Sequence, residues 1–193
     1  MRALLSLLLG GTLAFVVTAC GATAEPAPTA GPAPTYSPPP KPSVVHIPAI
    51  DVTSNIVDLG LQENGEMETP GDTKLAPSDP VKHTGWYTSS PLPGRPGATV
   101  LGAHVDWRGE DGPFAKLDQL KPGDEITVES VDGAKVTFVV DRVETYPKDQ
   151  FPHEKVYGDR PGPELVAITC GGSYDPAARS YRSNVVAYAK LKA

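Results

Sequence analysis

The sequence predicts a mainly β domain, either a closed barrel or a sandwich, behind an N-terminal export signal and a proline-rich linker. Three observations support this fold class. Short apolar, β-branched runs recur along the second part of the chain, glycine and proline separate them, and only one short segment has a helical pattern. The pattern alone does not choose between a barrel and a sandwich.

Residues 1–20 have the composition of an export signal. Arg2 is the only charge in the first 24 residues, and the apolar stretch behind it is shorter than the roughly 20 residues that span a bilayer. It closes with Val17-Thr18-Ala19-Cys20-Gly21, which resembles a bacterial lipobox, in which the cysteine is lipidated. An ordinary signal peptide and an uncleaved single-span anchor are the alternatives. All three interpretations place the rest of the chain outside the cytoplasm.

Residues 21–42 are rich in Pro, Ala, Thr, Gly and Ser and cannot bury a core. They predict a semi-rigid extracytoplasmic linker that precedes one domain at residues 43–193. The chain has a net charge of −6 and no basic patch. Nucleic-acid binding and a polybasic membrane contact are therefore not expected.

Strands are expected along the domain wherever β-branched or alternating apolar residues are bounded by turn residues. In chain order these are residues 44–50 (interrupted by Pro48), 98–104, 124–131, 134–143, 164–170 and 184–190. Asp132-Gly133 between two of these runs is a strong hairpin signal. Residues 112–120 are expected to form about two helical turns.

Cys170 is the candidate nucleophile. The sequence has two cysteines, and the export signal accounts for Cys20, so Cys170 is a lone thiol in an oxidising compartment. It ends an apolar run and is followed by Gly171-Gly172, which predicts a strand that stops at the sulfur. The alternative is an inert, buried cysteine of the kind that strands often contain.

A catalytic cysteine needs a base or cation nearby and a donor for the oxyanion. His104 is the best candidate base because it also ends an apolar strand. Arg182, expected just before the last strand, offers a permanently charged planar fork, and Arg179 competes for that role. The other histidines, His46, His83 and His153, are expected at the surface.

Several further residues have a functional and a structural interpretation. Asp106 either orients His104 or is a surface carboxylate. The aromatic residues Trp86, Tyr87 and Trp107 are expected to pack, and the acids of residues 63–72 to form a solvated loop. No third ligand accompanies His104 and Asp106 at metal spacing, so no metal site is expected.

These residues together resemble the sortase family. His104 in Gly102-Ala103-His104-Val105-Asp106 looks like the sortase histidine, and Ala167-Ile168-Thr169-Cys170 resembles the family's Thr-x-Thr-Cys motif. Arg182, twelve residues after the cysteine, matches the sortase arginine. The order of the three residues also fits.

Other stretches resemble the actinobacterial class F sortases in particular, namely residues 47–52, 85–87, 93–97 and 170–172. Two departures are visible. Ala103 is inserted between the glycine and the histidine of the usual Gly-His pair, and Ala167 replaces the first threonine of the cysteine motif.

The resemblance implies an eight-stranded β-barrel and a cysteine transpeptidase without a cofactor. Such an enzyme cleaves a Leu-Pro-x-Thr-Gly-like sorting signal through a thioacyl-enzyme and passes the acyl group to an amine of a cell-wall precursor or a lysine. Cys170, His104 and Arg182 would be catalytic, and Thr169 and Gly171 would contact the substrate. A monomer on the outer face of the bacterial cell membrane is expected. The alternatives are a thiol peptidase, which uses water in place of the amine, and a non-catalytic lipoprotein that binds peptide or cell-wall polymer.

Overall fold

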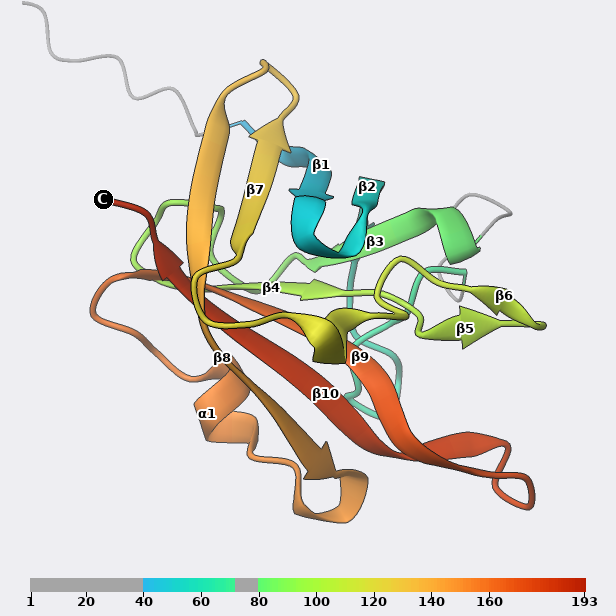
Figure 1. Ribbon diagram of the computed structural model, residues 1–193. Helices are drawn as coiled ribbons and strands as arrows, with labels where there is room; N and C mark the ends of the chain where they lie inside the picture. The colour runs from blue at the N-terminus through green and yellow to red at the C-terminus, as the bar shows by residue number, and fades with distance from the viewer. Residues whose placement is uncertain (1–39, 72–79) are drawn as a thin grey trace, which may run out of the picture. The chain divides into compact units, whose positions relative to one another are not determined.

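The structure, a computed structural model, describes residues 40–71 and 80–193 (Figure 1). The predicted export signal with Cys20 and nearly all of the predicted linker lie outside the described residues, as does Asp72 at the end of the predicted acidic loop. None of the helices in the described part of the chain has the length and apolar character needed to cross a bilayer.

The described residues form short strands with few helical turns. The strands are β1 Pro42–Ile47, β2 Val52–Leu59, β3 His83–Tyr87, β4 Gly97–Gly102, β5 Asp106–Trp107, β6 Glu110–Asp111, β7 Glu125–Ser130, β8 Lys135–Pro147, β9 Pro163–Asp175 and β10 Ser180–Leu191. The α-helix α1 spans His153–Tyr157, and 3-10 turns span Pro48–Ile50, Pro80–Lys82, Leu117–Gln119 and Lys148–Gln150.

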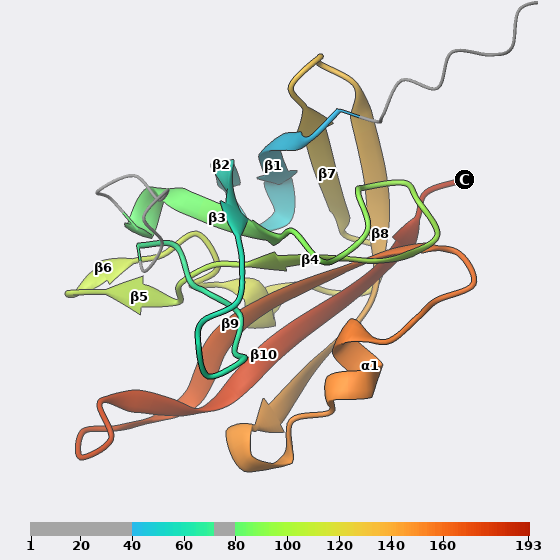
Figure 2. The same cartoon turned by 180° about the vertical axis from the view of Figure 1, so that it is seen from behind.

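Eight of the strands close into a barrel in the order β1-β2-β3-β4-β9-β10-β8-β7, while β5 and β6 form a separate two-stranded ribbon. The predicted mainly β, closed eight-stranded barrel is therefore confirmed. The pairs β2/β3 and β4/β9 are parallel, and the other neighbouring pairs are antiparallel. Figures 1 and 2 show β9 and β10 crossing the molecule as a long pair.

The longest apolar runs of the sequence are buried on both faces of the barrel wall. One set of side chains fills the barrel, for example Leu101, Leu165 and Val185. A second set on the outer face of β4, β9 and β10 packs against Val156 of α1. Residues 98–102 and 165–169 are therefore buried without a break, and these runs do not alternate between apolar and charged residues.

Helix α1 is fixed to the barrel by a polar group as well as by Val156. Lys155 donates to the Glu144 carboxylate of β8 at 2.7 Å, and Tyr146 donates to the same oxygen. These hydrogen bonds lower the pKa of Glu144 to about 2. These contacts together with Val156 thus hold α1 against the outer face of the barrel.

Three local expectations differ from the structure. The helix expected at residues 112–120 is only the 3-10 turn Leu117–Gln119, because the Phe114 N–H bonds back to the His104 carbonyl while Phe114, Leu117 and Leu120 bury their side chains. Strand β9 runs past Cys170 to Asp175 and does not stop at the sulfur. Strand β10 begins at Ser180, so Arg182 lies inside it and not before it.

Candidate active site

The register of two parallel strands brings His104 and Cys170 to the same end of the barrel wall. In the β4/β9 pair, Gly102 lies opposite Ile168. His104 follows Gly102 by two residues, and Cys170 follows Ile168 by two residues. Since neighbouring strands lie about 4.8 Å apart and side chains alternate, this register places the two residues beside each other on one face. His104 follows the end of β4, whereas Cys170 lies within β9.

Two hydrogen bonds hold these strand ends together beyond the regular pairing. The Ala103 N–H donates to the Ile168 carbonyl at 3.2 Å, and the Thr169 hydroxyl donates to the Ala103 carbonyl at 2.9 Å. Thr169 is buried, and its hydroxyl is thus committed to the barrel wall. This hydrogen bond holds Ala103, which precedes His104, beside Thr169, which precedes Cys170. We propose that Thr169 contacts substrate through its backbone only.

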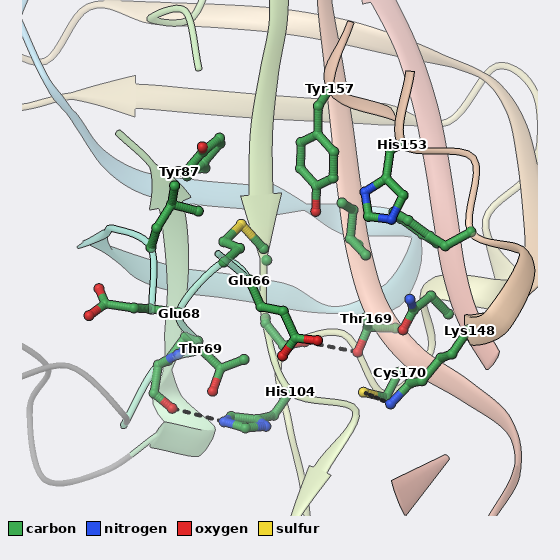
Figure 3. A pocket seen from close by; sticks show the side chains of 18 of the residues that line it. Glu66, Glu68, Thr69, Tyr87, His104, Lys148, His153, Tyr157, Thr169 and Cys170 are labelled. Atoms are coloured by element: carbon green, nitrogen blue, oxygen red, sulfur yellow. Dashed lines mark hydrogen bonds between the residues drawn. The ribbon is translucent and has the colours of Figure 1, made fainter. Parts of the chain in front are cut away.

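Cys170 opens into a groove of about 530 Å³ on the outer face of β4, β9 and β10. The groove residues are Leu61, Gly65–Pro70, Tyr87, Gly102–His104, Lys148, Phe151, His153, Tyr157, Ile168–Cys170 and Asn184. Figure 3 shows their side chains around the thiol. His153 and Tyr87 therefore line the groove, where the sequence predicted only a surface histidine and a packing aromatic.

Residues 61 and 65–70, which follow β2, form one wall of this groove. Residues 63–72 were expected to be a solvated loop, but Met67, Thr69 and Pro70 face the groove and Pro70 is buried. The Glu68 carboxylate accepts a hydrogen bond from the Gly60 N–H at 2.7 Å. No group of three or more His, Cys, Asp or Glu side chains in residues 40–71 and 80–193 is arranged to hold a metal ion.

The His104 ring is oriented by this wall. Its Nε2 lies 2.8 Å from the Pro70 carbonyl oxygen (Figure 3), which can only accept, so Nε2 carries a hydrogen. Nδ1 is then the nitrogen left for proton exchange. The Trp107 ring packs on His104 with centroids 5.0 Å apart. Asp106 hydrogen-bonds to Tyr181 and thereby raises the pKa of that phenol.

The half-exposed Cys170 thiol has a cation beside it that the sequence analysis missed. Lys148, in the 3-10 turn after β8, places Nζ 3.6 Å from Cys170 Sγ (Figure 3). The same Nζ lies 2.8 Å from the Ser180 hydroxyl oxygen. Nothing in the local sequence around Lys148 suggests this contact. It depends on β8 and β9 both pairing with β10, which brings residues 22 apart together.

Arg182 points toward the hairpin between β9 and β10. Its Nη2 donates to the Asp175 carboxylate at 3.0 Å, and 69% of its side chain is exposed. It lies where the β9/β10 register shifts, between the pairs Tyr181–Tyr174 and Ser183–Gly171. Gly172, on the other strand at this shift, has a φ of +73°, which favours glycine. The competing Arg179 is exposed at the hairpin tip and also has a positive φ of 51°.

Gly171 is buried against β10. A Cβ on this residue would lie 2.6 Å from Val185 Cγ2, so a side chain here would have to displace the Val185 side chain. Its backbone follows the thiol directly. We keep substrate contact at Gly171 as a proposal that involves backbone atoms alone.

The fold and the groove together define a barrel with a thiol, an imidazole and cationic side chains at one end of its outer face. A family profile described as Sortase domain matches residues 45–192. The chain belongs to the sortase family. Sortases are cysteine transpeptidases of the bacterial cell envelope, and membership extends this general activity to the chain.

Solved structures with the same fold are distant in sequence. Sortase C-1 from Actinomyces oris has 19% identity and a TM-score of 0.59 over 78% of this chain and 73% of that one. Sortase C1 from Streptococcus agalactiae has 20% identity and a TM-score of 0.58 over 78% and 67%. Sortase C from Streptococcus pneumoniae has 21% identity and a TM-score of 0.59 over 79% and 69%. No curated protein sequence matches the chain.

Proposed function

We propose that this sortase cleaves a Leu-Pro-x-Thr-Gly-like sorting signal after threonine and transfers the acyl group to an amine. The β4/β9 register carries the proposal, since it aligns His104 with Cys170 beside an open groove. We also propose that the chain is of the class F type, on the strength of residues 47–52, 85–87, 93–97 and 170–172. The acceptor would be an amine of a cell-wall precursor or a lysine.

Catalysis would proceed through a thioester. The Cys170 thiolate attacks the threonine carbonyl, the C–N bond breaks, and imidazolium His104 gives a proton from Nδ1 to the departing amine. An incoming amine then loses a proton to His104 and attacks the thioester carbon, and the C–S bond breaks to restore the thiolate. Nε2 keeps its hydrogen bond to Pro70 throughout, because only Nδ1 exchanges protons.

Arg182 is proposed as the donor to the oxyanion, together with backbone N–H groups near Gly171. This role requires Arg182 to leave Asp175. The ion pair is solvent-exposed on the arginine side, and such pairs contribute only about 0–1 kcal/mol to the stability of the fold. A substrate carbonyl that develops charge near β10 could therefore attract the guanidinium at little cost.

The test is to incubate the full chain with a library of sorting-signal peptides and an added amine, and to identify the products by mass spectrometry. Transfer to the amine supports the transpeptidase. If cleaved acid is the only product at saturating amine, the enzyme is a thiol peptidase. Unmodified peptides throughout the library, with binding retained, would favour the non-catalytic alternative.

His104→Ala should lose at least ~100-fold in transfer rate at every pH from 5 to 9, because the same nitrogen serves as acid and then as base. The measurement is kcat/KM for peptide cleavage across that pH range. His83→Ala, on β3 and outside the groove lining, is the matched control and should keep the wild-type profile. If His104→Ala shifts the pH optimum of kcat/KM but keeps its maximal value, this role is contradicted.

Cys20→Ala should block lipid attachment, because the thiol would carry the diacylglycerol. This rests on the proposal that residues 1–20 are a lipoprotein signal, which also places the enzyme at the outer face of the membrane. The measurement is the N-terminal mass of the mature protein from its native bacterium. A mature wild-type chain that begins at any residue other than Cys20 would disprove lipidation and leave the catalytic proposal intact.

A further inference from the structure

Lys148 lies beside the Cys170 sulfur but has no part in the mechanism proposed above. Its ammonium lies 3.6 Å from Cys170 Sγ, within hydrogen-bonding range of sulfur. The lysine follows Pro147, the last residue of β8, which pairs with Ser183 of β10. Its backbone is thus anchored to the same strand that pairs with the Cys170 strand.

Ser180 helps to hold the ammonium at the sulfur. The Ser180 hydroxyl donates to the Tyr181 carbonyl at 3.3 Å and so presents a lone pair to Lys148 Nζ at 2.8 Å. Lys148 is exposed, and an exposed lysine without such a partner would sample many rotamers. One polar contact on each side of the ammonium favours the rotamer that points at Cys170 (Figure 3).

The charges around the groove leave Lys148 as the cation for the resting thiol. Among the described residues that line the groove, it is the sole Lys or Arg. Arg182 is bonded to Asp175 and does not line the groove. His104 carries a full charge only when both of its nitrogens are protonated.

We propose that Lys148 is a further catalytic residue, which stabilises the Cys170 thiolate before substrate binds and again when the thiolate leaves the thioester. This deepens the proposed function and rests on it. The thiol proton passes to His104 Nδ1 or to water, and Lys148 keeps its three hydrogens. In the thioester the sulfur is neutral, so the ammonium favours the C–S bond breakage that restores the charge. Arg182 then acts on the carbonyl oxygen, and the two cations have separate roles.

The test measures alkylation of Cys170 without any peptide. The full-length chain reacts with iodoacetamide at pH 7, and mass spectrometry follows the tryptic peptide that carries Cys170, which separates it from Cys20. Lys148→Gln should slow alkylation about 5-fold, the effect that attraction between unit charges about 4 Å apart has in water. Lys148→Arg should keep most of the rate, and Ser180→Ala should lose part of it.

Two comparisons distinguish charge from access. Iodoacetate is an anion, so Lys148→Gln should slow its reaction more than that of neutral iodoacetamide. Lys121→Gln removes the same charge from an exposed site outside the groove and should leave both rates unchanged. Melting temperatures within about 2 °C of the wild type would show that the variants are folded.

An iodoacetamide rate in Lys148→Gln that equals the wild-type rate would overturn the proposal. A faster rate would overturn it too, because it would mean that the lysine merely shields the sulfur. Neither result would affect the proposed transpeptidation, which is judged separately by cleavage with Cys170→Ala. Conversely, transfer that survives in Cys170→Ala would disprove the proposed function whatever the alkylation rates are.

Discussion

Replacing Cys170 with alanine should abolish both cleavage and amine transfer. Every step proposed for this enzyme passes through a bond to Sγ, and Cys20 lies in the proposed export signal. Cys170→Ser should be nearly as inactive, because a serine hydroxyl is far less ionised than a thiol at neutral pH. The measurement is product formation from a sorting-signal peptide over a time at which the wild type completes its reaction.

Cys20→Ala is the matched control, since it removes the other cysteine of the chain. Purified Cys20→Ala protein should cleave peptide at the wild-type rate. Product from Cys170→Ala at more than about a thousandth of the wild-type rate would contradict the thioester mechanism, because removal of a covalent nucleophile costs more than that. The same result would leave the sortase fold unchanged.

The mainly β character of the domain could be predicted from local signals, whereas the closed barrel was expected only from the resemblance to the sortase family. Cys170 as the nucleophile stays a prediction. Asp132-Gly133 does form the turn between β7 and β8, where Gly133 has a φ of +85°. The apolar run that ends in Cys170 is a buried strand, as its composition suggested. These features depend on residues that are neighbours in sequence, which is why the pattern was sufficient.

The groove could not be predicted because its walls come from segments far apart in the chain. Pro70 contacts His104 across 34 residues, and Lys148 contacts Cys170 across 22. Residues 63–71 are polar and have no periodic pattern, so their sequence gave no sign that they cover a groove. Strand β9 also continues through two glycines, because β10 pairs with it up to Asp175.

The position of the Arg182 side chain also could not be predicted from the sequence. Its spacing from Cys170 predicted a role at the thiol, yet the β-bulge at Gly172 and the carboxylate of Asp175 hold its side chain at the hairpin. Asp175 is itself fixed there, since its Oδ1 accepts from the Ala177 N–H at 3.0 Å. In the proposed mechanism, Arg182 is therefore the partner that would leave this ion pair when substrate binds.

Arg182→Ala should lower kcat for peptide cleavage by about 10²–10³-fold, the usual cost of removing one oxyanion donor. Arg182→Lys should be impaired almost as much, because a point-charge ammonium cannot reproduce the planar fork. Arg179→Ala, at the exposed hairpin tip, is the matched control and should stay within about 2-fold of the wild type, as surface substitutions with no key partner usually do.

Asp175→Asn separates this role from a structural one. Asparagine keeps the Oδ1 acceptor for the Ala177 N–H but removes the charge that holds Arg182, so its kcat should equal or exceed that of the wild type. Single-turnover cleavage by all four variants would measure the chemical step directly. If Asp175→Asn loses as much activity as Arg182→Ala, the arginine acts through its ion pair with the hairpin and not on the oxyanion. If Arg179→Ala is inactive while Arg182→Ala is active, the catalytic arginine is Arg179.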